Sequence, residues 1–231
     1  MPLLLRVVLV SVTACFAGCR SQPVVTAPHA PGAGPGAGLG PSAVVYLAHY
    51  DYYHTGLVVP RDGRAVEYTY ADWDMLALGE RTGWNKFKAV ALPSRGALGR
   101  AEVPWQGGSD ASLRESLDRC WKLSRYRVDA RRLDRLTETL DADFAAAVAR
   151  TGSVAHEGMS FAKAPRPYWI LHNCNHALRE WLIDLGFGVP RRVALADFQT
   201  PGAVHTYAPG RESGGMRTDF SELVGERPDG D

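Results

Sequence analysis

The sequence predicts one α+β domain over residues 43–208, in which an antiparallel sheet is covered by packed helices. Short apolar segments bounded by turn residues fill the first half of this range. Later segments repeat apolar residues every three or four positions, which is the period of a helix with one buried face. The length suits a single folded unit, and no part of the sequence repeats another.

Residues 1–19 predict a secretory signal that ends at an acylation site. They hold one basic residue, no acidic residue, and an apolar run too short for a stable membrane span. The run ends in Phe16-Ala-Gly-Cys19, which resembles the cleavage site of bacterial lipoproteins, where the cysteine becomes the lipid-carrying first residue. Cys15 fits the same pattern with a shorter apolar run and is the rival lipidation site. Cleavage without lipid is the remaining alternative.

Several acyl chains would hold such a protein durably at a membrane. Arg20, rather than Asp, follows Cys19. By resemblance to Gram-negative lipoproteins, this predicts a cell-envelope protein at the outer membrane that faces the periplasm.

Residues 20–42 predict a tether, because Pro, Gly and Ala dominate them from Ala27 onward and cannot form a core. As a flexible coil, this stretch spans roughly 25–30 Å. The chain has 26 basic and 25 acidic residues, and loss of residues 1–19 removes only Arg6. The mature chain then has no net charge and no basic cluster, which argues against a nucleic-acid partner.

The first half of the domain predicts strands. Residues 43–49 and 54–59 are apolar runs, and Arg61-Asp-Gly-Arg64 predicts a hairpin turn to a third strand over 65–70. Residues 87–92 and 100–103 are predicted to form two further strands.

Two helices are predicted next. Ser112-Leu-Arg-Glu115 has the pattern of a capping box, and Leu113, Leu117, Cys120 and Trp121 follow at helical spacing. The second helix carries Leu133, Leu136, Leu140, Phe144 and Val148 on one side. Residues 151–167 predict a loop, and residues 209–231 a disordered polar tail.

Cys174 opens a third helix, whose stripe of Leu178, Trp181, Leu182 and Leu185 ends at Gly186. The unpaired backbone N–H groups of a first helical turn favour a thiolate over a thiol. Cys174 is therefore the candidate nucleophile. Cys120 lies on an apolar stripe and is predicted to be a buried, inert thiol.

A cysteine nucleophile needs a base within reach. His54 begins the second strand, where a rigid strand end can hold an imidazole. His176 lies two residues from Cys174, about 200° around the helix, and should face away from the sulfur. His172 precedes the helix on an extended segment and stays open as an alternative. Without Cys-x-x-Cys or His-Glu-x-x-His pairs, no metal or other cofactor is expected.

Tyr53-His54-Thr-Gly-Leu-Val, followed much later by Asn173-Cys-Asn-His-Ala-Leu, resembles the permuted papain-like thiol hydrolases. These include NlpC-type peptidases and lecithin retinol acyltransferase-like proteins. More closely, the chain resembles an uncharacterised bacterial family found in urease gene regions. Four pieces carry that likeness: residues 44–58, residues 67–72, Cys174-Asn175 with Leu178 and Leu182, and Thr200-Pro201.

The chain departs from that family at Thr69, Tyr70 and Ala71, where the family has Gly-Trp-Gly, and at Ala177, where Trp is common. The resemblance implies a single permuted papain-like domain with Cys174 as nucleophile and His54 as base. It also implies that Glu67 orients the histidine.

The strand register leaves that last role open. A tight turn at residues 62–63 puts Glu67 opposite Val58, on the face of His54 but four residues along the strand. Asp72, nearly opposite His54, is the rival orienting residue. The backbone N–H of Cys174 is the expected oxyanion donor.

The expected function is a membrane-anchored envelope cysteine hydrolase or acyltransferase that uses a Cys174/His54 dyad. Its substrate would be an amide, ester or thioester bond in a cell-wall peptide or a lipid acyl group. The alternative is a catalytically silent envelope lipoprotein that binds peptidoglycan or a protein partner.

Overall fold

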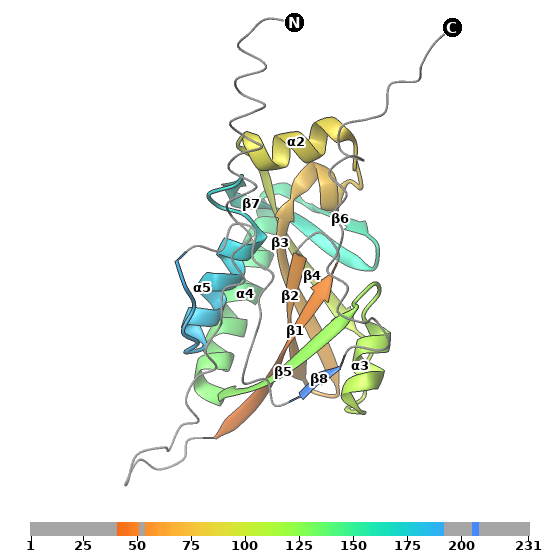
Figure 1. The fold of residues 1–231 in the computed structure, drawn as a ribbon, viewed down its shortest axis with the longest axis vertical. Coiled ribbons are helices and arrows are strands. Elements are labelled where there is room, and N and C mark those ends of the chain that lie inside the picture. The colour runs from red at the N-terminus through yellow and green to blue at the C-terminus, as the bar shows by residue number, and fades with distance from the viewer. Residues whose placement is uncertain (1–40, 51–53, 192–204, 208–231) are drawn as a thin grey trace, which may run out of the picture.

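The structure is a computed structural model that describes residues 41–50, 54–191 and 205–207. These residues form an α+β fold, as predicted, around a sheet of seven antiparallel strands with a further three-residue strand at one edge. The strand order is β6-β7-β4-β3-β2-β1-β5-β8. Figure 1 shows the sheet running the length of the molecule, with helices along its sides and across its upper end.

The centre of the sheet is the predicted meander of β1 (Ser42–Tyr50), β2 (His54–Arg61) and β3 (Arg64–Asp72). Asp62 and Gly63 have φ angles of 48° and 76°, the positive values that a tight two-residue hairpin turn requires. This turn fixes the register, and Val58 pairs with Glu67 as the sequence predicts.

On one side of the meander lie β4 (Ser94–Val103), β7 (Met159–Tyr168) and β6 (Ser153–His156). The loop predicted over residues 151–167 is wrong, because these residues form the β6–β7 hairpin. The hairpin turns at Glu157-Gly158, both with positive φ. Turns with this backbone geometry usually have the sequence Asn-Gly.

On the other side lies β5 (Lys122–Asp129), with β8 (His205–Tyr207) at the edge. The helix predicted from Ser112 to Trp121 is correct only in part. Helix α3 (Asp110–Ser116) begins one turn earlier, where the Ser109 hydroxyl accepts the Ser112 N–H, and it ends before the residues that lead into β5.

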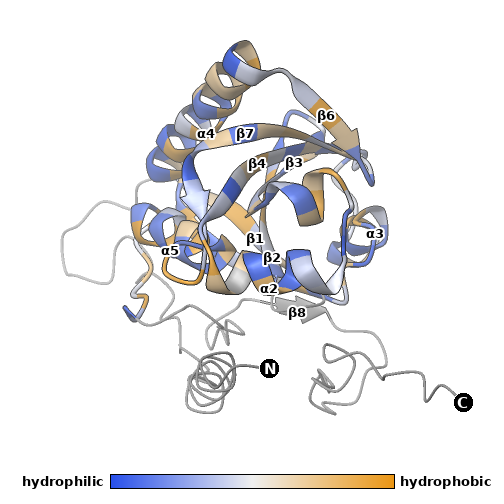
Figure 2. Ribbon diagram, turned by 90° about the horizontal axis from the view of Figure 1, so that it is seen from above, coloured by the Kyte–Doolittle hydropathy of each residue, from blue (hydrophilic) through white to orange (hydrophobic). Residues whose placement is uncertain are grey.

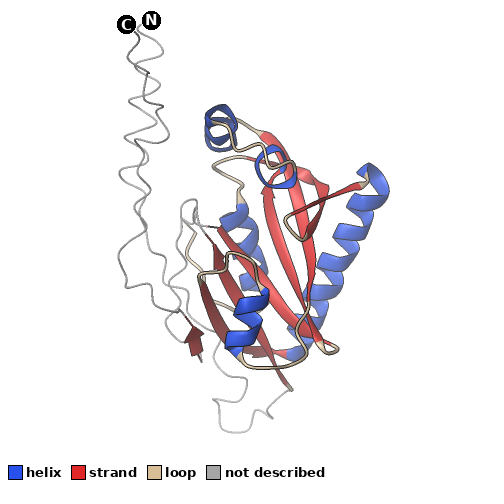
Figure 3. Cartoon of the chain, turned by 90° about the vertical axis from the view of Figure 1, so that its right-hand side faces the viewer, coloured by secondary structure: helices blue, strands red, loops and turns tan. Residues whose placement is uncertain are grey.

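The strand predicted over residues 87–92 is wrong, since these residues belong to helix α2 (Gly83–Ala91) and its end. The Thr82 hydroxyl caps this helix by accepting the N–H of Asn85. Before it comes η1 (Trp73–Ala77), a short helical turn capped by Asp72. In Figure 3, the short helices at the top lie beyond the strand ends, whereas the longest helix runs alongside the strands.

That longest helix is α4 (Ala130–Thr151), and α5 (Cys174–Asp184) lies beside it. Both cover the same face of the sheet, while α3 covers the other, as Figure 2 shows from above. The larger apolar core lies under α4 and α5 and includes Val45, Leu47, Leu57, Val59, Val66, Tyr68, Leu178 and Leu182. The second core lies under α3 and includes Tyr46, Ala48, Val58, Ala65, Leu113, Leu117 and Cys120.

Candidate functional site

Cys174 is the first residue of α5, as predicted. Asn173 caps the helix through its side-chain oxygen, which accepts the N–H groups of Asn175 at 3.1 Å and His176 at 3.3 Å. The side chain of His176 reaches back to Asn173 and completes a capping box. His176 therefore takes part in capping the helix start.

The Cys174 sulfur is held by a tyrosine hydroxyl. Tyr168 Oη donates to Sγ at 3.7 Å, and the ring of Tyr168 stacks on that of Tyr70 with centroids 5.8 Å apart. Burial raises the pKa of the Cys174 thiol, although the Tyr168 hydroxyl and the backbone N–H of Asn175 act in the opposite direction. Desolvation wins, so the group favours the thiol over the thiolate.

His54 lies at the start of β2, as predicted, and its imidazole is bound by Thr69. The Thr69 hydroxyl oxygen is 2.7 Å from Nε2 of His54. The ring of Tyr50 lies alongside, with centroids 5.9 Å apart. Burial lowers the pKa of His54 to about 4, so the imidazole is neutral at neutral pH.

Glu67 lies on the same face of the sheet as His54, but its partner is Tyr50. The Tyr50 hydroxyl donates to Oε1 of Glu67 at 2.7 Å. Burial raises the pKa of Glu67 to about 7, which the Tyr50 hydrogen bond only partly opposes. Among the described residues the hydrogen bond of the His54 imidazole is to Thr69 and not to Glu67.

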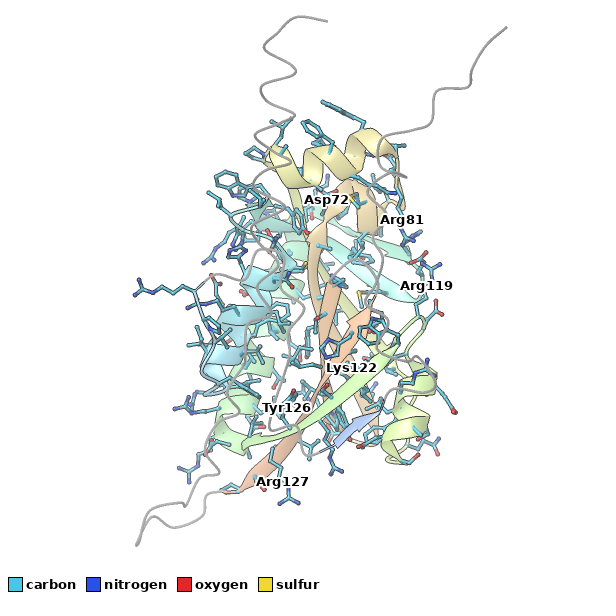
Figure 4. The ribbon with its side chains drawn as sticks, in the orientation of Figure 1. Asp72, Arg81, Arg119, Lys122, Tyr126 and Arg127 are labelled. Carbon is cyan, nitrogen blue, oxygen red and sulfur yellow. The ribbon has the colours of Figure 1, made fainter. Side chains whose placement is uncertain are left out.

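Asp72, the rival orienting residue, does not bind His54 either. Its carboxylate accepts the N–H of Met75 at 2.9 Å, which caps η1, and the hydroxyl of Ser94. Asp72 pairs with Gly96 of β4 and lies two residues beyond Tyr70, on the other face of β3 from Glu67. Figure 4 shows it at the upper end of the sheet, below α2.

Strand alternation places His54 and Cys174 on opposite faces of the sheet. His54 pairs with Tyr50 and lies two and four residues from Gly56 and Val58, which puts it on the face covered by α3. The α5 residues that follow Cys174 pack on Leu57 and its neighbours, the opposite face. The described residues show no contact between the members of the predicted dyad.

His172, the alternative base, lies on the face of Cys174. Its ring centroid is 5.2 Å from that of Tyr70, in the same group of rings as Tyr168. Burial lowers the pKa of His172, so its imidazole is also neutral at neutral pH.

Sequence reasoning missed Thr69, Tyr50 and Tyr168. Thr69 is two residues beyond Glu67 on the same face, so period-two alternation alone could have identified it as a neighbour of His54. Tyr168 ends a strand that was not predicted, so no signal connected it to Cys174.

Cys120 is a free, buried thiol, as predicted, and burial raises its pKa to about 12. Within the described ranges, His, Cys, Asp and Glu form no group of three or more that could hold a metal ion. Nor does any helix there combine the length and the apolar character needed to cross a bilayer. Cys15, Cys19, the tether, Thr200-Pro201 and the tail of residues 209–231 lie outside the described residues.

Comparisons of the chain with known protein families, with characterised proteins and with solved structures give no match.

Proposed function

We propose that the protein is an envelope lipoprotein, anchored through Cys19, whose domain has the layout of a permuted papain-like fold but does not use its thiol for catalysis. Its role is to bind a partner in the envelope, peptidoglycan or another protein. The observation that carries this proposal is the separation of the two predicted catalytic groups, with the imidazole of His54 bound to Thr69 on the side away from Cys174.

The separation cannot be removed by a side-chain rotation. Only a one-residue slip of β2 would move His54 to the face of Cys174. The same slip would turn Leu57 and Val59, both almost fully buried, out of the main core. It would also move Val58 out of the second core, and mispacking two close-packed cores is costly, so the observed register is strongly preferred.

The residue that holds His54 is also where the chain departs from the family it resembles. Thr69 stands where that family has glycine, which has no hydroxyl to offer. Its bond to Nε2 holds the one imidazole that the resemblance names as a base on the face of the sheet away from Cys174. An imidazole of lowered pKa is a weak base and a thiol of raised pKa is rarely ionised at neutral pH, so the two groups are a poor starting point for nucleophilic catalysis.

The second candidate is a cysteine hydrolase or acyltransferase that acts on a cell-wall peptide or a lipid acyl group. One observation favours it: the Cys174 sulfur lies at a helix N-terminus and accepts a backbone N–H of Asn175. In this candidate the base comes from the α5 side of the sheet, where His172 lies against Tyr70.

Alkylation separates the two candidates. For the silent domain we expect iodoacetamide at pH 7.5 to label Cys174 about as slowly as Cys120, with no change on His54→Ala or His172→Ala. Unfolding in urea should make both cysteines react fast. Rapid labelling of Cys174 in the folded protein, slowed by His172→Ala or His54→Ala, would establish the enzyme instead.

A second measurement reads the reaction directly. The protein is incubated with an envelope extract, and its intact mass is compared with that of Cys174→Ser. The silent domain shows no adduct on Cys174 but sediments with insoluble peptidoglycan or retains a protein partner.

A further inference from the structure

Exposed apolar side chains gather in one short segment of the fold. The described residues have six large apolar side chains that are clearly exposed, and four of them lie between residues 78 and 92. These four are Leu78 at 42%, Trp84 at 63%, Phe87 at 37% and Leu92 at 44%. Single exposed apolar residues are common on proteins, but a local group that includes an exposed indole indicates a contact surface.

The group belongs to α2 and its flanks, at one end of the molecule. Trp84 and Phe87 are three residues apart on the helix, and their rings stack with centroids 5.7 Å apart. The opposite side of α2 is buried through Asn85 and Ala89. In Figures 1 and 2 the helix lies across the upper end of the sheet, so its aromatic side faces away from the core.

The charges around α2 are basic. Residues 81–95 contain no Asp or Glu but four basic residues: Arg81, Lys86, Lys88 and Arg95. Neighbouring acids offset some of this charge, since Lys88 and Arg95 pair with Asp74, and Arg81 (Figure 4) pairs with Glu157. The aromatic side chains are therefore the main attraction to any partner, and the basic residues add a smaller one.

We propose that the aromatic side of α2 docks on the surface of the phospholipid bilayer that holds the anchor. This proposal rests on the anchoring part of the proposed function. Trp and other amphipathic rings favour the membrane–water interface, and Lys and Arg next to them can reach lipid phosphates. Docking would turn a freely tumbling tethered domain into one with a fixed orientation.

The length of chain between anchor and domain permits this orientation. Figure 1 shows β1 beginning at the lower end of the molecule, opposite α2. A ten-residue strand such as β4 spans about 33 Å, so the path from Ser42 back to the level of α2 is on the order of 40 Å. Residues 20–41 can extend to about 70 Å, so an acylated Cys19 reaches the same bilayer surface as α2.

The test uses the full acylated chain, reconstituted in vesicles of phosphatidylcholine and phosphatidylglycerol with or without brominated acyl chains. The chain has six tryptophans, so subtracting the emission of Trp84→Phe from that of the wild type isolates Trp84. We expect brominated lipid to quench at least half of the Trp84 signal. Vesicles should also protect Trp84 at least threefold from aqueous acrylamide.

A matched pair of variants tests whether the group acts together. Phe87→Ser should lower the quenching of Trp84 by brominated lipid at least twofold. Ile183→Ser is the control, because Ile183 is similarly exposed, at 40%, but lies on α5. It should leave the quenching unchanged.

Two results overturn the proposal while leaving the anchor intact. In one, the protein floats with the vesicles but Trp84 is open to acrylamide and unaffected by brominated lipid. In the other, Trp84 is shielded from both quenchers, which means that protein, from this chain or a second copy, covers the helix. If the protein does not float with the vesicles, the proposed lipid anchor is wrong. Quenching of Trp84 at high lipid concentration then tests the docking of α2 by itself.

Discussion

Replacing Gly56 by alanine tests the packing of the face that holds His54 and Glu67. A Cβ at position 56 would lie 2.3 Å from Oε1 and 3.2 Å from Cδ of Glu67, well inside contact distance. Glu67 is buried and held by the Tyr50 hydroxyl at 2.7 Å, so it cannot move aside without breaking that bond. Overpacking and the lost hydrogen bond each cost about 1–3 kcal/mol, and we expect a destabilisation of about 2–3 kcal/mol.

The assay is urea unfolding of four proteins: wild type, Gly56→Ala, Glu67→Ala and the double variant. In the Glu67→Ala background the space beside position 56 is empty. There Gly56→Ala should be neutral or stabilising by a few tenths of a kcal/mol, because alanine restricts the unfolded chain. The expected coupling energy is thus about 2–3 kcal/mol. Equal effects of Gly56→Ala in both backgrounds would refute the placement of Glu67 against Gly56.

Three further predictions concern the same groups. Thr69→Val leaves Nε2 of His54 without its partner and should lower the free energy of unfolding by about 1–3 kcal/mol at pH 7; a loss below 0.5 kcal/mol would show that this bond does not form. Because the pKa of Glu67 is raised from 4.5 to about 7, the folded protein holds an extra proton between these values. Stability from this group is therefore lost as the pH rises through that window, by up to about 3 kcal/mol, and Glu67→Gln should abolish the loss in urea titrations across pH 4.5–8. Finally, Tyr168→Phe removes a hydrogen bond that lowers the thiol pKa, so alkylation of Cys174 at pH 8.5 should become slower, and an unchanged or faster rate would contradict the Tyr168–Cys174 contact.

The elements that could be predicted are those with two agreeing signals. Asp62-Gly63 between two apolar runs gave the hairpin and its register, because a two-residue turn allows one pairing only. The helix at Cys174 had an apolar stripe, a capping residue and Gly186 at its end, where φ is 92°.

The errors arose where one signal stood alone. The apolar run of residues 87–92 fits a strand or a helix, and the capping hydroxyl of Thr82 that decides for a helix lies five residues earlier. The pattern at Ser112 looked like a helix start, but Ser109 is the cap. The β6–β7 hairpin turns at Glu157-Gly158, which is a rare sequence for that geometry.

Prediction of the candidate site from the sequence failed for a different reason, which concerns the two faces of the sheet. The order of a histidine strand and a cysteine helix along the chain suggests a dyad, yet order does not determine which face of the strand the histidine occupies. That depends on whether His54 is an odd or an even number of residues from the strand positions that contact the helix. Leu57 contacts the core under α5, and the odd separation of His54 from Leu57 sends the imidazole to the opposite side.

The alternation of β2 side chains between the two faces also explains why His54 and Glu67 each have their own hydrogen-bond partner. His54, Gly56 and Val58 alternate with Thr55, Leu57 and Val59, so both faces of β2 carry residues that burial requires. The polar groups on the α3 face must then find partners there, and they do so locally, His54 with Thr69 and Glu67 with Tyr50. Both polar groups thus have hydrogen-bond partners on the face of the sheet away from Cys174.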